Sequence, residues 1–275
     1  MPYLLIIPAV LALGLLLWFL AIQGRRGHVL LPKIRSWSYA HRGLHGEGRP
    51  ENSMSAFRAA LEGGYGIELD VHLLKDGSLA VIHDSKLLRT TGAEGDVEDL
   101  TEAELASYHL EGTTETIPTF RQVVELFAGK APLVVELKVH KNNVAALCQT
   151  TCDLLDQYDI LYCMESFDPR CLIWLKKHRP DLMRGQLTEN YFKSPNVKIP
   201  GILKWILAHN LSNFLTRPDF TAYRYRDRHY TPSNRYLVKH YAGVSWTLQS
   251  QEEYDTATKE GWIPIFENFR PPSHS

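Results

Sequence analysis

The stretch GIELDVHLLKDGSLAVIH, residues 66–83, contains two apolar runs that carry charged or polar side chains. Residues 66–71 and 79–83 are rich in Ile, Leu and Val, a composition typical of β-strands. Apart from two acidic residues the first run is almost continuously apolar, as expected of a parallel strand that is buried on both faces. The stretch therefore predicts buried strands of a parallel sheet.

Outward from this stretch, short β-rich runs alternate with amphipathic helical segments. Such alternation indicates βα units, and about eight strands in ~240 residues fit a (β/α)8 TIM barrel of the α/β class. An open doubly wound sheet is the alternative, but the G-x-G-x-x-G signature after its first strand is absent. The expected strands cover residues 39–42, 66–71, 79–83, 133–139, 162–166, 183–187, 220–225, 244–248 and 262–266.

Three segments depart from a regular barrel. Residues 85–117 form a polar insertion after the second strand region. The chain ends shortly after the strand at 262–266, so we expect the last helix to be truncated or missing. Residues 197–207 are apolar with interspersed lysines, and their helical spacing favours an outer barrel helix over a membrane-surface helix.

The composition is that of an ordinary folded protein, with 44% hydrophobic and 22% charged residues. A net charge of -1 makes nucleic acid a poor candidate as partner. The four cysteines lie in apolar surroundings without metal-type spacing, so we expect buried thiols rather than a disulfide framework.

The N-terminus is the exception to this ordinary composition. Residues 3–22 are uncharged and Leu-rich, and about 20 such residues match the hydrocarbon core of a bilayer. Because the run lacks a basic start and a clean cleavage site, it favours an uncleaved transmembrane anchor over a signal peptide. We therefore expect an anchor at 1–24, a basic juxtamembrane connector at 25–37 and a barrel domain at 38–275. Basic residues follow the anchor, which predicts a cell-membrane protein with its barrel on the cytoplasmic side.

Two strands carry pairs of charged residues that share one face. Residues i and i+2 of a strand point the same way, so Glu68 projects with Asp70, and Glu136 projects with Lys138. Charges inside buried strands need a metal, a counter-ion or water. Three carboxylates at the carboxyl-end rim of a barrel would suit Mg²⁺ or Ca²⁺, whereas the alternative is a set of buried salt bridges.

Two histidines lie where neighbouring strands end. His41 precedes Arg42 at the end of the first strand, and His83 ends the strand at 79–83. Such a pair beside an acidic cluster indicates a general acid and a general base. Arg42 and Lys138 supply positive charge that suits a phosphate, so the residues predict metal-assisted phosphoryl chemistry.

An ordered set of short motifs extends this prediction. With these motifs the chain resembles the glycerophosphodiester phosphodiesterase family, a phospholipase-C-like (β/α)8 barrel, over roughly residues 38–250. The motifs are His41-Arg42-Gly43, Pro50-Glu51-Asn52-Ser53, Glu68-Leu69-Asp70-Val71, Lys75-Asp76-Gly77, Val81-Ile82-His83-Asp84, Leu88-Arg89-Thr90-Thr91-Gly92, Ile117-Pro118-Thr119-Phe120, Glu136-Leu137-Lys138 and Ser166-Phe167-Asp168.

The resemblance implies a role for each site residue and one divalent cation, Mg²⁺ or Ca²⁺, with Mn²⁺ as a further option. It implies hydrolysis of a glycerophosphodiester to sn-glycerol 3-phosphate and an alcohol, through a cyclic phosphate or by direct attack of water. The implied residues are His41 and His83 as the acid–base pair, Glu68, Asp70 and Glu136 as metal ligands, Arg42 and Lys138 for the phosphate, Glu51 near the metal, and Trp246 in the substrate pocket or in barrel packing.

One departure from the family pattern concerns the end of the last strand. A Thr-Asp-x-Pro-like motif is usual there, whereas this chain has Phe266-Glu267-Asn268-Phe269-Arg270-Pro271, in which Glu267 and Asn268 are the candidate replacements. The altered motif leaves open a phosphodiester-binding scaffold without turnover. A second alternative, lysophospholipase-D-like hydrolysis at the same site, would suit a barrel tethered to a bilayer.

Overall fold

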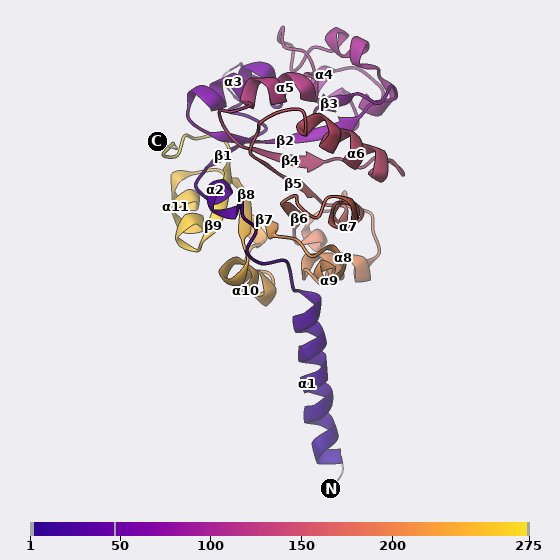
Figure 1. Ribbon diagram of the computed structural model, residues 1–275, viewed down its shortest axis with the longest axis vertical. Coiled ribbons are helices and arrows are strands. Elements are labelled where there is room, and N and C mark those ends of the chain that lie inside the picture. Colours follow the sequence, from indigo (N-terminus) through magenta and orange to yellow (C-terminus); the bar gives the residue numbers. More distant parts are fainter. Residues whose placement is uncertain (1–2, 47, 274–275) are drawn as a thin grey trace.

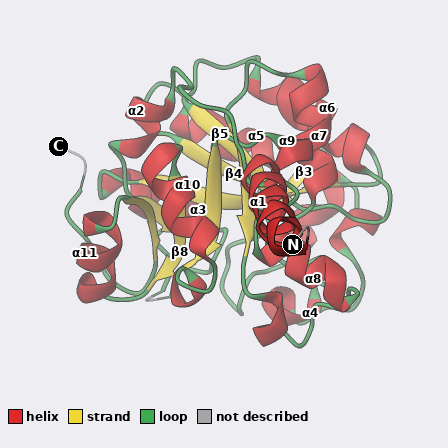
Figure 2. Ribbon diagram, turned by 90° about the horizontal axis from the view of Figure 1, so that it is seen from below, coloured by secondary structure: helices red, strands yellow, loops and turns green. Residues whose placement is uncertain are grey.

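Parallel strands close into a barrel in the computed structural model, which describes residues 3–46 and 48–273 (Figure 1). The order is β1-β9-β8-β7-β6-β5-β4-β2, and pairing of β1 with β2 closes the ring. Seen from below, helices surround the sheet (Figure 2). The predicted TIM barrel is thus confirmed. The barrel strands are β1 (Tyr39–His41), β2 (Gly66–Leu73), β4 (Leu133–Leu137), β5 (Tyr162–Ser166), β6 (Arg184–Thr188), β7 (Phe220–Arg224), β8 (Gly243–Leu248) and β9 (Trp262–Phe266).

One predicted strand lies outside the ring. Strand β3 (Leu79–Val81) pairs antiparallel with β2, so it extends β2 as a hairpin. In the described residues no helix follows β9. The helices are α1 (Tyr3–Ala21), α2 (Leu31–Arg35), α3 (Met54–Glu62), α4 (Leu88–Thr91), α5 (Phe120–Phe127), α6 (Val144–Leu155), α7 (Pro169–His178), α8 (Gly201–Ala208), α9 (Asn213–Thr216), α10 (Pro232–His240) and α11 (Gln251–Lys259).

The alternation of side chains along β2 separates the core from the site. Ile67 and Leu69 pack with the buried residues of the surrounding helices, such as Phe57 of α3. Glu68 and Asp70 therefore point into the barrel. On β4, Val134 belongs to a second apolar cluster with residues of β5 to β9, which fills the barrel below the charged level. The four cysteines are buried and free, as expected.

The polar insertion has a small core of its own. It contains α4 and two 3₁₀ helices, Val97–Asp99 and Glu102–Ser107. Leu87, Val97 and Leu105 pack there against residues next to β3. The capping box of Thr119 and Gln122 then starts α5. The insertion therefore lies between the β2–β3 hairpin and its helix, as the sequence predicted.

The N-terminal helix α1 projects away from the barrel (Figure 1), and its large apolar side chains from Ile6 to Leu20 are mostly exposed. Within the described part of the chain, no helix is both long and apolar enough to cross a membrane. The predicted transmembrane anchor over residues 1–24 is therefore not supported, and residues 1 and 2 lie outside the described residues.

The segment 25–37 contacts the barrel along its length. Nε and Nη2 of Arg25 each lie 2.6 Å from the carboxylate of Asp219, which is buried in the loop before β7. Ile34 is fully buried, and its carbonyl accepts a hydrogen bond from the hydroxyl of Tyr39 at 2.8 Å. This segment is thus part of the packed base of the barrel.

Helix α8 corrects one sequence expectation. Its spacing predicted a buried stripe, but Ile202 and Leu203 are 63% and 45% exposed, and only Ala208 of α8 is buried. The periodicity identified a helix but not which face is covered, because that depends on the neighbouring elements.

Candidate active site

The predicted site residues gather where the parallel strands end. His41 is the last residue of β1, Glu68 and Asp70 lie in β2, and Glu136 lies near the end of β4. His83 follows β3 by two residues, because the hairpin leads the chain back toward the same end of the barrel. The carboxyl end of the strands is where TIM-barrel active sites lie.

Three predicted carboxylates converge there. Glu68, Asp70 and Glu136 each offer an oxygen within 4.8 Å of the others. All three side chains are buried, and the sheet register pairs Asp70 with Glu136. Burial and the neighbouring acids raise the pKa of Glu68 well above its usual value. Burial also raises the pKa of Asp70, but Lys138 and other cations outweigh this and hold it well below the usual range.

A fourth acid, Glu165, was missed by the sequence analysis. It lies on β5 in register with Glu136, is 1% exposed, and its Oε2 has no hydrogen-bond partner. Burial, followed by the charge of Glu136, raises its pKa well above the usual value. The available signal was an acid in an apolar strand, like Glu68, but no second charged residue shares its strand.

Both predicted phosphate-binding cations contact these acids. Lys138 Nζ lies 2.9 Å from Asp70 Oδ1 and 2.7 Å from Glu136 Oε1. Burial lowers the pKa of Lys138, but the two carboxylates outweigh it, so the pKa is raised and the ammonium stays charged. The salt bridges considered as an alternative thus do form. They leave four buried acids against two permanent cations, because within residues 3–46 and 48–273 Arg42 is the only other Arg or Lys side chain that pairs with them.

Glu51 does not lie against the three carboxylates. Its Oε1 is 3.0 Å from Arg42 Nη1 and 2.6 Å from Arg89 Nη2. Arg42 Nε in turn lies 3.5 Å from Asp70 Oδ2. Glu51 thus lies behind the carboxylate cluster and contacts it through Arg42, one of the positions that the resemblance implies for it. Asn52, next in the chain, donates to Asp70 at 2.8 Å, while Ser53 caps α3.

His41 has a carboxylate partner that lies 226 residues further along the chain. Its Nδ1 lies 2.7 Å from Glu267 Oε2, and its Nε2 lies 3.8 Å from Glu68 Oε2. Burial lowers the pKa of His41, and the hydrogen bond to Glu267 offsets only part of this. The imidazole is therefore neutral near pH 7 and can accept a proton at Nε2.

Glu267 makes two further contacts. His45 Nε2 lies 3.6 Å from its Oε2, and Gln249 donates to its Oε1 at 2.9 Å. Burial raises the pKa of Glu267, but the hydrogen bonds of both histidines and of Gln249 hold it well below the usual range. The sequence analysis had left open whether Glu267 or Asn268 replaces the usual motif, and it is Glu267 that contacts the site.

His83 has the same arrangement with a neighbouring residue. Its Nδ1 lies 2.6 Å from Asp84 Oδ1. Arg89 contacts both Asp84 and Glu51, and so ties the two carboxylates together. Each histidine of the predicted pair thus has a carboxylate on Nδ1, which fixes the tautomer and leaves Nε2 for other chemistry.

Cavities surround this cluster. A groove of about 620 Å³ is lined by His83, Lys138 and Phe167, among others. A small cavity of about 40 Å³ is lined by residues that include His41, Glu68 and Trp246. Trp246 also borders a cavity of about 370 Å³ and meets Phe167 edge-on, with ring centroids 5.6 Å apart. Trp246 thus borders the cavities and also packs against the apolar cluster inside the barrel, so both of its predicted positions remain open.

A family model for the glycerophosphoryl diester phosphodiesterase family matches residues 41–218, which is more than half of the chain. The chain belongs to this family. The match begins at His41 and includes the converging carboxylates of β2 and β4.

Two relatives of this family are similar to parts of the chain. A glycerophosphodiester phosphodiesterase of Bacillus altitudinis is 45% identical over 113 residues, which cover 38% of this chain and 45% of that protein. A lysophospholipase D of Rattus norvegicus is 38% identical over 132 residues, which cover 43% of this chain and 40% of that protein. The chain thus spans less than half the length of these two relatives.

The fold has counterparts among solved structures. A phosphodiesterase of Oleispira antarctica, solved in complex with the product sn-glycerol-3-phosphate, superposes with a TM-score of 0.69 at 22% identity. The superposition covers 85% of this chain and 93% of that one. This likeness supports the barrel fold of the family.

Proposed function

We propose that the site hydrolyses glycerophosphodiesters to sn-glycerol 3-phosphate and an alcohol. The observation that carries the proposal is the pair of carboxylate-oriented imidazoles, His41 and His83, beside one cluster of buried acids. A phosphodiester needs a base for the attacking hydroxyl, an acid for the leaving alcohol and positive charge at the phosphate oxygens. The described residues place a base, an acid and positive charge around one cavity.

The acids fit a divalent cation, which would be Mg²⁺ or Ca²⁺, with Mn²⁺ as the alternative. Carboxylate oxygens are the ligands these ions prefer, and the four buried acids exceed the two permanent cations that pair with them. The unpartnered Oε2 of Glu165 adds to that excess. Glu68, Asp70 and Glu136 would hold the cation, which when bound supplies Lewis-acid polarisation of the phosphate.

The histidines divide the proton transfers. His41, whose pKa burial lowers, accepts the proton of the attacking hydroxyl at Nε2. His83 donates a proton from Nε2 to the leaving alcohol. The attacking group is either a glycerol hydroxyl, which gives a cyclic phosphate that water then opens, or water itself. Arg42 and Lys138 hold the phosphate oxygens, and Glu51 keeps Arg42 in place.

A lysophospholipid is the second candidate substrate. The named lysophospholipase D relative supports it, as do the exposed apolar side chains Ile202 and Leu203 of α8, which suit a lipid surface. Both substrates use the same site. Turnover of glycerophosphocholine and lysophosphatidylcholine, compared at equal concentration, separates the two candidates.

A coupled assay for glycerol 3-phosphate, run with Mg²⁺, Ca²⁺ and Mn²⁺ in turn, tests the proposal. We expect release with at least one cation and its loss in Glu136→Gln. The matched control is Glu62→Gln, an exposed acid at the end of α3, which keeps normal turnover. The account reduces to a non-catalytic phosphodiester-binding scaffold if no cation supports release of glycerol 3-phosphate from glycerophosphocholine or glycerophosphoethanolamine, or of choline from lysophosphatidylcholine.

We also propose that the protein is located at the cell membrane with the barrel on the cytoplasmic side. The exposed apolar side chains of α1 support membrane association, as do Phe214 and Leu215 of the adjacent α9. The basic residues after α1 suit the anionic surface of the cytoplasmic leaflet, which supports this side. Leu13→Arg with Leu16→Arg should move the protein out of the membrane fraction, whereas Ile173→Arg on α7 should not. Protection of the barrel from protease in sealed membrane vesicles shows on which side of the membrane the barrel lies.

A further inference from the structure

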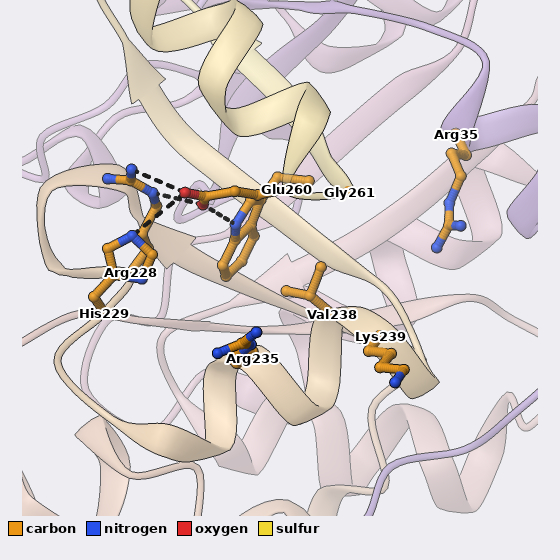
Figure 3. A pocket seen from close by; sticks show the side chains of 9 residues that line it. Arg35, Arg228, His229, Arg235, Val238, Lys239, Glu260 and Gly261 are labelled. Carbon is orange, nitrogen blue, oxygen red and sulfur yellow. Dashed lines mark hydrogen bonds and ion pairs between the residues drawn. The ribbon is translucent and has the colours of Figure 1, made fainter.

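A second large cavity lies outside the barrel, between α10 and α11, away from the carboxyl ends of the strands. Its volume is about 550 Å³. Figure 3 shows its lining side chains around one opening, with Arg228 and Arg35 on opposite sides and Arg235 between them. Nothing in the proposed hydrolysis uses these residues.

The lining is strongly basic. Its cationic or titratable side chains are Arg35, Arg228, His229, Arg235 and Lys239. Its one acid is Glu260, whose carboxylate already accepts hydrogen bonds from Arg228 at 2.8 Å and from the Trp262 indole at 3.2 Å.

His229 Nε2 also lies 3.4 Å from Glu260 Oε1, whereas among the described residues the other three cations of the lining are not paired with an acid. Within residues 3–46 and 48–273, no ion pair joins Arg235 or Lys239 to an acid, and Arg35 donates only to the carbonyl of Tyr241, at 3.3 Å. Guanidinium and ammonium groups that surround one cavity are suited to the several oxygens of a phosphate group. The cavity is therefore suited to a phosphate-bearing anion.

The position of the cavity identifies the source of that phosphate. Tyr236 of α10 meets Phe19 of α1 with ring centroids 5.6 Å apart, and its hydroxyl accepts a hydrogen bond from Arg26 at 3.2 Å. The helix that lines the cavity is thus in contact with the base of α1, whose apolar side chains are exposed. An apolar helix beside a basic cluster is typical of a surface that meets anionic lipids.

We propose that the cavity between α10 and α11 binds the phosphate of an anionic phospholipid head group. The bound head group would hold the base of the barrel against the lipid surface. This site is separate from the hydrolytic site and does not depend on turnover.

Vesicle binding by the full chain tests this proposal. We compare phosphatidylglycerol-containing vesicles with pure phosphatidylcholine vesicles, so that the contribution of α1 is common to both. The wild type should prefer the anionic vesicles, and Arg235→Gln with Lys239→Gln should reduce that preference by about tenfold or more. The matched control is Arg58→Gln on α3 combined with Lys177→Gln on α7. It removes the same number of charges far from the cavity and should change the preference for anionic vesicles little.

Three results would overturn the proposal. The first is equal binding of the wild type to both kinds of vesicle, and the second is a cavity variant that loses no more preference than the control. The third is calorimetry in which inorganic phosphate binds the wild type but not the cavity variant while vesicle preference is unchanged, which would assign the site to a soluble phosphate. Matching thermal unfolding of both variants and the wild type shows that the comparison concerns binding rather than folding.

Discussion

At the scale of single residues, the site is built from imidazoles whose free nitrogen is defined by a carboxylate. His41 has Glu267 on Nδ1, and His83 has Asp84 in the same position. A carboxylate on Nδ1 fixes the tautomer and stabilises the imidazolium formed when Nε2 takes a proton. The two histidines therefore differ in partner and burial but are prepared for proton transfer in the same way.

Glu267→Gln tests this arrangement at His41. The carboxylate raises the pKa of His41 against the effect of burial, so its loss should lower that pKa further. The acidic limb of the kcat–pH profile should then move to lower pH, and kcat should fall by about 10- to 100-fold with little change in KM, since the tautomer is no longer fixed.

Glu253→Gln is the matched control for Glu267→Gln. Glu253 accepts a hydrogen bond from the backbone of Gln249, near the site, but does not contact His41. Glu253→Gln should leave kcat and the acidic limb of the kcat–pH profile unchanged. If Glu267→Gln has the same kcat and the same acidic limb as the wild type, Glu267 does not position His41.

At the scale of elements, the insertion is tied to the barrel by buried polar contacts. Glu98 of the insertion accepts a hydrogen bond from His72 of β2 at 2.7 Å and one from Ser85 at 2.6 Å. The other nitrogen of His72 lies 3.3 Å from the carbonyl of His83. The insertion thus supports the backbone that carries a proposed catalytic residue.

The pH dependence of the free energy of unfolding measures the contribution of the Glu98 contacts. Burial raises the pKa of Glu98, but His72 and Ser85 outweigh burial and lower it to about 2. The free energy of unfolding therefore contains a contribution that is present above the unfolded pKa of about 4.3 and is lost as pH falls toward 2. Glu98→Gln should cost about 2 kcal/mol at pH 7 and remove that acid-dependent loss.

Urea unfolding at pH 7 and at pH 3 measures both effects. Glu102→Gln, an exposed acid of the same insertion, should behave as the wild type at both values. Equal stability of Glu98→Gln and the wild type at pH 7 would mean that the contact does not hold the insertion.

The limits of the sequence analysis also lie at this scale. The i, i+2 rule placed Glu68 beside Asp70, because both lie in one strand. The partnership of His41 with Glu267 depends on the pairing of β1 with β9, which no local pattern contains. Glu165 needed the β4–β5 register for the same reason. Local periodicity predicts strands and their faces, but barrel closure decides which faces meet.

At the scale of the whole molecule, the base of the barrel is held by the segment that leads in from α1. Arg25 reaches Asp219 with two nitrogens and also donates to the carbonyl of Leu182 at 2.7 Å. The sequence predicted a basic connector here from its charge alone. The packing partner lies in the loop before β7, far along the chain, so the contact was not predictable.

Arg25→Ala should lower the free energy of unfolding by about 2–3 kcal/mol, because the buried carboxylate of Asp219 loses its cation. Thermal or urea unfolding measures the change. Arg26→Ala is the control, since Arg26 contacts the exposed edge of Tyr236 and should cost about 0.5 kcal/mol or less. Similar stability of both variants would show that this segment does not secure the barrel.

The central claim is that His41 and His83 perform acid–base catalysis on a glycerophosphodiester. Its most direct test is kcat for release of glycerol 3-phosphate from glycerophosphocholine, with the activating cation present, by the wild type, His41→Ala and His83→Ala. Each variant should lose at least about 100-fold in kcat while its thermal unfolding matches the wild type. A folded variant of either histidine that keeps near-normal kcat would contradict the claim.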